Sequence, residues 1–356
     1  MKVKNITVYG LLYHSDCNLD IGSSPLTFIY SANGFGKTTL LKALISSMEG
    51  DVECLEALPF DRIDIGFSDG VVLIVDKRDG IDIMVSKNEI EHPVDKEELN
   101  ELFKIMYISP ERQVVIGPDG HLTPAIDAYA DELRENIRNA VENNALVEPK
   151  GDYAKDMSDG ELVFLFMDLK AKLDYMKGAG LEPDLPSSLR FPPTHSDVSR
   201  KRDEYEKLAF GLEDYIDRNY RLSESIVVSQ DIMNRMFRGK TLHINEKNNM
   251  VFKLDSGADL PLNSLSSGEK NVLVILYRLL FQAVEGSIVV IDEPENSLHI
   301  EWQQRLGDIF LDIAELRNLQ FIVATHSPQI IHDKWDMSRE LRDLNAENSE
   351  TGRYCE

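Results

Sequence analysis

Apolar and polar positions divide the chain into a strand-rich part, a helical part and a second part that contains strands. Alternation with a period of two, or a short apolar run, predicts a strand, whereas apolar residues at every third or fourth position predict a helix. On this basis strands are expected at 2–9, 18–21, 26–30, 62–67, 71–75, 81–85, 104–108, 241–245, 250–254, 287–291 and 319–325. Helices are expected at 37–48, 97–103, 125–144, 159–176, 198–220, 223–237, 267–284 and 300–316.

The order of these elements predicts an α/β fold with a mixed central sheet and flanking helices, interrupted by a helical insertion. Ser68-Asp69-Gly70 and Arg78-Asp79-Gly80 are hairpin signals between the early strands, so that part of the sheet is expected to be antiparallel. We expect a first α/β segment at 1–110, the helical insertion at 111–238 and a second α/β segment at 239–335. A polar, loosely ordered tail is expected at 336–356.

The segment Ser31-Ala32-Asn33-Gly34-Phe35-Gly36-Lys37-Thr38 follows a predicted strand and opens a predicted helix. It matches the phosphate-binding loop, Gly-x4-Gly-Lys-Ser/Thr, except that Ser31 replaces the first glycine. Such a loop points backbone N–H groups at phosphate oxygens, and the helix N-terminus adds a partial positive charge. We expect Lys37 to be a catalytic residue that holds the β- and γ-phosphates, and Thr38 to be a Mg²⁺ ligand. The other nucleotide-binding residues expected here are Asn33, Gly34, Gly36 and Thr39. The alternative is a glycine-rich turn before a helix.

A second segment with candidate catalytic and metal-binding residues is Ile288-Val289-Val290-Ile291-Asp292-Glu293, an apolar strand that ends in two carboxylates. A run buried on both faces is typical of a central parallel strand, and ligands collect at the carboxyl ends of such strands. We therefore expect Asp292 to hold Mg²⁺ beside Thr38, directly or through water. Glu293 is expected to be the catalytic base that orients or deprotonates the attacking water. Taken alone, the segment also fits a strand that ends in an acidic turn.

A histidine and a serine-rich turn complete the set of phosphate-binding candidates. His326 follows the last predicted strand, where it can reach the γ-phosphate as a catalytic hydrogen-bonding sensor. The turn Ser264-Leu265-Ser266-Ser267-Gly268-Glu269-Lys270 precedes a predicted helix, so Ser266, Ser267 and Gly268 are expected to meet a phosphate at a second helix N-terminus. On their own, a structural histidine and an ordinary helix cap would explain these two segments.

The composition of the chain argues against extended nucleic-acid binding and against a membrane partner. The formal net charge is −24, which opposes a protein that coats nucleic acid, so any DNA contact would have to be local. The densest basic run, Arg200-Lys201-Arg202, is followed by acidic residues and fits a solvated helix face. No apolar segment approaches the length of a membrane span, the N-terminus lacks the apolar core of a signal peptide, and the cysteines show no metal or disulfide spacing. We expect a cytoplasmic protein with no membrane partner.

Together, the four segments resemble the nucleotide site of ABC-type ATPases. Leu265-Ser266-Ser267-Gly268-Glu269 is similar to the signature motif of that family, and Lys37, Asp292-Glu293 and His326 stand in the family's order around it. The resemblance implies an ABC ATPase head, with residues 1–110 as its N-terminal half and 239–335 as its C-terminal half. ATP and Mg²⁺ are the implied cofactors, and the implied activity is hydrolysis of ATP to ADP and phosphate.

The resemblance also implies partners. In ABC-type ATPases the signature of one copy completes the nucleotide site of the other, so we expect a head-to-tail dimer or a higher oligomer. Asn296-Ser297-Leu298-His299 resembles the loop that crosses between the two sites, although His299 stands where the family often has an acidic residue. Gln113 is the candidate for the glutamine loop and a further Mg²⁺ ligand.

The spacing and the residues of the motifs indicate which branch of the ABC-type ATPases the chain resembles. Lys37 and Ser266 are clearly farther apart than in a transporter head, and the insertion is too short for the long coiled coil of chromosome-organising ATPases. Asp-Glu-Pro-Glu-Asn-Ser-Leu-His and Ala-Thr-His-Ser-Pro-Gln-Ile-Ile resemble the bacterial ATPases related to the overcoming-lysogenisation-defect family. Those ATPases occur in anti-phage systems such as Gabija, Septu and PARIS. Too few residues follow His326 for the nuclease domain of that family, so the resemblance implies a separate effector, expected to be a nuclease.

The preferred hypothesis is an ATP-hydrolysing subunit of an anti-phage defence system, which controls this effector through nucleotide-dependent head dimerisation. The first alternative is a RecF-like or SMC-like DNA-repair ATPase that acts directly on DNA. Salt-sensitive DNA binding coupled to ATP would favour it. The second alternative is a transporter head, which would require a membrane partner.

Overall fold

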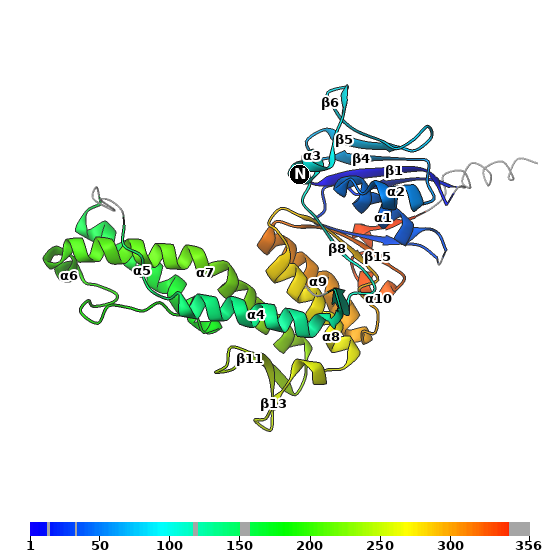
Figure 1. Cartoon of the computed structure of the whole chain (residues 1–356). Helices are drawn as coiled ribbons and strands as arrows, with labels where there is room; N and C mark the ends of the chain where they lie inside the picture. The colour runs from blue at the N-terminus through cyan, green and yellow to red at the C-terminus, as the bar shows by residue number, and fades with distance from the viewer. Residues whose placement is uncertain (13–14, 33, 117–119, 150–156, 342–356) are drawn as a thin grey trace, which may run out of the picture. The chain divides into compact units, whose positions relative to one another are not determined.

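The computed structural model describes residues 1–12, 15–32, 34–116, 120–149 and 157–341 (Figure 1). The chain forms two compact units. We call Met1–Arg112 with Ser267–Glu356 the head unit, and Gln113–Ser266 the helical unit. The helical unit therefore extends through the hairpin strands that the sequence assigned to the second α/β segment, and its limits differ from the predicted 111–238.

The head unit contains two sheets and their helices. Its strands are β1 Val3–Leu11, β2 Ser15–Asp20, β3 Leu26–Tyr30, β4 Arg62–Phe67, β5 Val71–Asp76, β6 Asp82–Lys87, β7 Ile90–Pro93, β8 Ile105–Ile108, β14 Ile288–Asp292, β15 Gln320–Thr325 and β16 Ser338–Glu340. Its helices are α1 Lys37–Glu49, α2 Val52–Ala57, α3 Lys96–Leu102, α8 Ser267–Tyr277, α9 Ile300–Arg317 and α10 Pro328–Ile331, with a π-helical turn at Arg278–Gln282 and a 3-10 turn at Trp335–Met337.

One sheet of the head unit is antiparallel and the other is parallel. The antiparallel sheet has the order β2-β1-β4-β5-β6-β7, and the parallel sheet has the order β16-β3-β15-β14-β8. Parallel strands all end at the same edge of their sheet. The residues that follow β3, β14, β15 and β8 are therefore brought to one edge, although they come from distant parts of the sequence.

Helix α1 lies in a core shared by the two sheets. Leu40, Leu41 and Leu44 on α1 are fully buried in the same cluster as Ile65 of the antiparallel sheet and Val290 of the parallel sheet. On α9, Phe310 stacks on Phe321 of β15 with a ring-centroid distance of 5.1 Å. Every residue of β14 and β15 is buried, which is the pattern of central parallel strands covered on both faces. This packing fixes the strand ends on which the site is built.

The helical unit is organised around α5 and α7, which lie side by side (Figure 1). Phe166 on α5 packs edge-on against Tyr205 on α7, at 5.7 Å between ring centroids, and both are buried. The elements of this unit are β9 Val114–Ile116, β10 Leu122–Pro124, α4 Ala125–Glu142, α5 Asp159–Met176, a 3-10 turn at Lys177–Ala179, α6 His195–Arg200, α7 Arg202–Met236, β11 Lys240–Ile244, β12 Met250–Leu254, β13 Asp259–Leu260 and a 3-10 turn at Leu262–Ser264.

The fold class is confirmed, since parallel and antiparallel strands, flanking helices and an interrupting helical unit are all present. The break predicted between helices at 198–220 and 223–237 is wrong, because α7 is continuous. Ser223, where the second helix is predicted to start, lies in the middle of α7, and its side chain is buried.

Two other expectations also need correction. The helix predicted at 267–284 is α-helical only to Tyr277 and ends in the π-helical turn. The expectation of a loosely ordered tail is wrong for its first residues, because β16 adds a parallel strand beside β3. Residues 342–356 of that tail lie outside the described residues. The short elements α2, β7, β9 and β10 were not predicted from the sequence.

Candidate functional site

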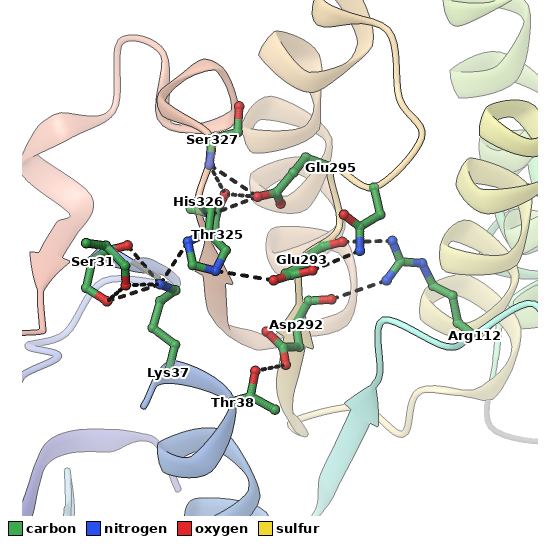
Figure 2. Close-up of polar contacts among 12 residues, drawn as sticks. Ser31, Lys37, Thr38, Arg112, Asp292, Glu293, Glu295, Thr325, His326 and Ser327 are labelled. Atoms are coloured by element: carbon green, nitrogen blue, oxygen red, sulfur yellow. Dashed lines mark hydrogen bonds and ion pairs between the residues drawn. The ribbon is translucent and has the colours of Figure 1, made fainter. Parts of the chain in front are cut away.

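The predicted chemical residues of the head unit meet at the carboxyl edge of the parallel sheet. Figure 2 shows Lys37 and Thr38 approaching from the start of α1, Asp292 and Glu293 from the end of β14, and His326 from the end of β15. These residues lie more than 250 positions apart at the extremes of the set, as the Thr38–Asp292 contact illustrates with its separation of 254. The sheet topology alone brings them together.

The phosphate loop ends at Gly36, whose φ of 88° is in the left-handed region that favours glycine. No described side chain caps the N-terminus of α1, and the first turn of α1 contains no acidic residue. Its leading N–H groups are therefore suited to an anion. Asn33, predicted to bind nucleotide, lies outside the described residues. Thr39 is half-buried in the first turn of α1.

The Lys37 ammonium is held within this edge by local acceptors. Its Nζ donates to Ser31 O at 2.8 Å, to Ser31 Oγ at 3.0 Å and to Ala32 O at 3.3 Å, and it lies 3.0 Å from His326 Nδ1. Burial lowers the pKa of Lys37, and the charges of Glu293, Asp292 and Glu295 oppose that shift. The hydroxyl of Ser31, the residue that departs from the loop template, thus takes part in holding the lysine.

The Asp292 carboxylate has one oxygen engaged and one oxygen free. Thr38 Oγ1 donates to Asp292 Oδ2 at 2.8 Å, whereas Oδ1 is buried and has no hydrogen-bond partner among the described residues. Burial raises the pKa of Asp292, and the nearby Glu293 and Glu295 charges raise it further against the hydrogen bond from Thr38. An orphaned carboxylate oxygen beside a threonine hydroxyl is the oxygen donor set that Mg²⁺ takes. These two residues therefore fit the predicted magnesium site.

Within the described ranges, no three His, Cys, Asp or Glu side chains are grouped as a metal site of their own. A Mg²⁺ ion that keeps several waters and is shared with phosphate oxygens does not need such a group.

Glu293 and His326 face each other across the strand ends. Their closest atoms, Glu293 Oε1 and His326 Nε2, are 3.3 Å apart, and Asn296 Nδ2 donates to Glu293 Oε2 at 3.0 Å. Because the Lys37 ammonium can only donate, its contact with Nδ1 fits a histidine that carries its proton on Nε2, which then points at Glu293. Lys37, His326 and Glu293 thus form a continuous polar chain (Figure 2).

Two residues that the sequence analysis did not select hold these strand ends in place. Glu295 Oε1 accepts from Thr325 Oγ1 at 2.5 Å, from His326 N at 2.9 Å and from Ser327 N at 3.2 Å. Arg112 donates to main-chain oxygens at the end of β14. A signal was available for Glu295, since it is the third carboxylate of Asp-Glu-Pro-Glu. The role of Arg112 depends on partners about 180 positions away, so no local pattern indicates it.

A hollow of about 500 Å³ opens beside these residues. It is lined by Glu293, Glu295, Asn296, His326, Ser327 and Pro328. The two side chains proposed to act on the γ-phosphate and on water therefore both border open space, which is what their predicted roles require.

The signature residues occupy another part of the fold. Ser266 and Ser267 are exposed, and Gly268 is buried at the start of α8, where an added Cβ would lie 2.4 Å from the Ser297 carbonyl oxygen. Nearby, Asn271 Nδ2 donates to Asn296 O at 2.6 Å. Glycine at 268 is thus explained by close packing within the head unit. Gln113, predicted as a further Mg²⁺ ligand, has an exposed side chain and belongs to the helical unit, so its role remains a prediction.

The fold and the edge geometry define a class of protein: an α/β ATPase domain whose predicted phosphate-binding loop lies at the edge of the parallel sheet. Residues 115–332, more than half of the chain, match a family model described as "AAA domain, putative AbiEii toxin, Type IV TA system". The chain belongs to this family of ATPase domains, in agreement with the predicted enzyme class. The matched region includes the signature, the two carboxylates and His326, but it begins after the phosphate loop.

Similarity to curated proteins is confined to short stretches. Over 92 residues, 22% of this chain, the identity to the probable ATPase of retron Ec83 from Escherichia coli is 35%. Over 132 residues, 32% of this chain, the identity to the probable ATPase of retron Vc95 from Vibrio cholerae serotype O1 biovar El Tor is 27%. A probable iron chelatin transport ATP-binding protein of Helicobacter pylori is 31% identical over 94 residues, 26% of this chain and 36% of that protein. The chain spans only 16% and 24% of the length of the two retron relatives.

Solved structures give weak likenesses. The SMC head domain from Thermotoga maritima has a TM-score of 0.43 at 13% identity, covering 93% of this chain and 91% of that chain. The Smc head with an extended coiled coil bound to the C-terminal domain of ScpA, from Pyrococcus furiosus, has a TM-score of 0.46 at 13% identity, covering 98% of each chain.

None of the helices in the described ranges combines the length and the apolar composition needed to cross a bilayer.

Proposed function

We propose that this protein binds Mg²⁺-ATP at the carboxyl edge of the parallel sheet and hydrolyses it. The observation that carries the proposal is the convergence of Lys37, Thr38, Asp292, Glu293 and His326 at that edge, with an open helix N-terminus beside them. Each of these side chains has a distinct task in phosphoryl transfer to water, and the tasks do not overlap.

Binding and metal positioning fall to the first three residues. Lys37 exchanges its contacts with Ser31 and Ala32 for the β- and γ-phosphates, which are stronger acceptors. Thr38 and Asp292 would hold Mg²⁺, with the Asp292 Oδ1 atom directed at the ion or at one of its waters. When bound, Mg²⁺ neutralises charge that builds up on the phosphate oxygens.

Glu293 and His326 act in the hydrolysis step itself. Glu293 orients the attacking water and accepts its proton, and His326 donates from Nε2 to a γ-phosphate oxygen or holds Glu293 before nucleotide arrives. Glu295, with three hydrogen bonds to the turn after β15, fixes the backbone that carries His326.

We propose further that two copies associate head to tail. The exposed Ser266 and Ser267, with Gly268 behind them, would complete the nucleotide site of the partner copy, as the resemblance to ABC-type ATPases implies. Nucleotide state would then be coupled to association, because ATP binds the closed dimer more tightly than the open one.

At the level of biology, we propose an ATPase subunit of an anti-phage defence system that controls a separate effector, expected to be a nuclease. The support is the match to the AbiEii-type family and the stretches shared with two proteins named as retron probable ATPases. A transport role is supported by short matches to the iron chelatin transport ATP-binding proteins of two Helicobacter pylori strains, and direct action on DNA is opposed by the charge of −24.

One experiment tests both levels of the proposal. Tagged Glu293→Gln protein is expressed from the native locus, purified with ATP and Mg²⁺, and analysed for bound protein and nucleic acid by mass spectrometry and gel staining. We expect retained ATP and a stoichiometric nuclease-like partner. Recovery of DNA with repair proteins, or of a membrane protein, would favour the corresponding alternative, and protein without ATP would contradict the proposed nucleotide site.

A further inference from the structure

Arg112 is the last residue of the head unit before the helical unit, and its guanidinium is buried at the end of β14. Nη1 donates to Ser109 O at 3.0 Å and to Asp292 O at 3.2 Å, and Nη2 donates to Glu293 O at 3.0 Å and to Pro294 O at 3.2 Å. Only main-chain oxygens appear among these partners (Figure 2 shows the guanidinium beside the turn). Arg112 therefore binds the main-chain carbonyls of a backbone turn rather than its side chains.

The turn that Arg112 binds is an unfavourable one. Glu293 has a φ of 48°, in the left-handed region that a residue with a side chain adopts only at an energetic cost. Three consecutive carbonyls, of Asp292, Glu293 and Pro294, point to the same guanidinium. Buried carbonyls that converge in this way need a shared donor, and a planar guanidinium can supply several donors in fixed directions. The conformation of Glu293 and the presence of Arg112 thus depend on each other.

Arg112 retains its charge under ordinary conditions. Burial lowers the pKa of Arg112 to about 10, and the charges of Glu295, Asp292 and Glu293 oppose the shift. At neutral pH the guanidinium is therefore protonated and can donate to all of these carbonyls. A lysine at the same place would keep the positive charge but could not reproduce the forked, planar set of donors.

We propose that Arg112 is a positioning residue for Glu293: it holds the backbone of the Asp292–Pro294 turn so that the Glu293 carboxylate faces His326 and the attacking water. The kinetic part of this inference rests on the proposed ATPase function. Arg112 itself touches neither nucleotide nor water in this scheme, and its whole effect passes through the Glu293 turn.

The kinetic test compares the wild-type protein with Arg112→Lys, and uses Arg62→Lys as the control. Arg62 pairs with Asp64 in the antiparallel sheet, at 2.7 Å, away from the strand ends of the site. For Arg112→Lys we expect kcat to fall about 10- to 100-fold while KM and the Kd for Mg²⁺-ATP change less than about 3-fold. For Arg62→Lys we expect no change in either constant. Equal losses in kcat and in ATP affinity would mean that Arg112 only supports the fold, which overturns the proposal.

A double variant tests whether the effect passes through Glu293. In the Glu293→Gln background, Arg112→Lys should cause no further loss of single-turnover rate, because the group that Arg112 positions is already gone. Independent, multiplicative losses would contradict the positioning role.

A double-mutant cycle on unfolding stability tests the link between Arg112 and the Glu293 turn without measuring ATP hydrolysis. Glycine adopts positive φ at little cost, so Glu293→Gly removes the strain that Arg112 offsets. We expect Arg112→Lys to lower the urea midpoint less in the Glu293→Gly background than in the wild type. Identical shifts in the two backgrounds would overturn the inference. If the wild-type protein proved unable to hydrolyse ATP, the proposed function would fail, while this cycle would still test the role of Arg112.

Discussion

The two sides of the candidate site are held in different ways. On the phosphate-loop side, Lys37 is bound by the side chain and carbonyl of Ser31 and by His326, which are groups that a phosphate can replace. On the carboxylate side, the backbone of Glu293 is held by a buried guanidinium, and His326 is held through its own N–H by Glu295. We infer that the first side adapts to the nucleotide, whereas the second is organised before nucleotide arrives.

The largest effect is expected on the adaptable side. Lys37→Met keeps much of the side-chain volume but removes the ammonium, and loss of its charge-assisted contacts should weaken ATP binding by about 100-fold or more. Isothermal titration with Mg²⁺-ATP would measure this. Lys77→Met is the matched control, because Lys77 is another lysine whose pKa is lowered by burial and whose ammonium donates to a carbonyl, Leu58 O at 2.6 Å. If both variants bound ATP normally, Lys37 would not be the phosphate ligand.

The next effect is expected on the organised side. Glu293→Gln should reduce kcat by about 100-fold or more while ATP affinity is kept, because a general base contributes about 10²- to 10⁴-fold. Steady-state phosphate release together with nucleotide titration separates the two quantities. The exposed Glu98→Gln, on α3, serves as the control. Normal turnover by Glu293→Gln would remove Glu293 from the role of catalytic base.

Asp292 contacts Thr38 on the phosphate-loop side and stands beside Glu293 on the carboxylate side. Its replacement should raise the stability of the nucleotide-free protein and remove the stabilisation by Mg²⁺-ATP. Burial raises the pKa of Asp292, so the ionised carboxylate costs stability at neutral pH in the nucleotide-free protein. We expect Asp292→Asn to raise the free energy of unfolding by about 1–2 kcal/mol at pH 7 and to abolish the stabilisation by Mg²⁺-ATP. Urea unfolding with and without Mg²⁺-ATP measures both.

The pH dependence of that difference follows from the raised pKa. As pH falls from 7 through the raised pKa of Asp292, the wild-type carboxyl takes up a proton and regains stability, so the advantage of Asp292→Asn should shrink. Glu49→Gln provides the control, because burial also raises the pKa of Glu49. It should stabilise in the same pH-dependent way without loss of the Mg²⁺-ATP effect. A stabilising advantage of Asp292→Asn that is constant with pH would contradict this explanation.

The smallest effect is expected at Ser31. Ser31→Gly restores the loop template and removes a hydroxyl that lies 3.0 Å from Lys37 Nζ. The hydroxyl competes with phosphate for the lysine, but water replaces it readily, so ATP affinity should rise or stay constant within about 3-fold. A loss greater than 10-fold would show that the hydroxyl contributes to nucleotide binding and that this side is less adaptable than proposed.

The sequence predicted the parts of this molecule that depend on local patterns. The buried runs at β14 and β15 and the glycine-lysine-threonine loop gave both the α/β fold class and the side chains that meet at the sheet edge. Their catalytic and binding roles stay predictions. The break expected near Ser223 is wrong because burial of the Ser223 side chain in the middle of α7 is a tertiary outcome that the local sequence does not indicate.

Features that depend on distant partners were not predicted. No periodicity or motif in the sequence indicates the role of Arg112, because its partners are carbonyls at the end of another strand. The end of α8 in a π-helical turn and the pairing of β16 with β3 are likewise tertiary outcomes. Asn33 lies outside the described residues, so its predicted contact with nucleotide stays a prediction.

Arg112 stands at the point along the chain where the head unit ends. The next residue, Gln113, begins the helical unit, and the Gln113 carbonyl accepts from the N–H of Ala125, the first residue of α4, at 2.8 Å. The start of α4 is thus hydrogen-bonded to the residue that directly follows Arg112 in the chain. If Arg112 positions Glu293 as proposed, a single peptide bond separates the residue that holds the Glu293 turn from the first residue of the helical unit.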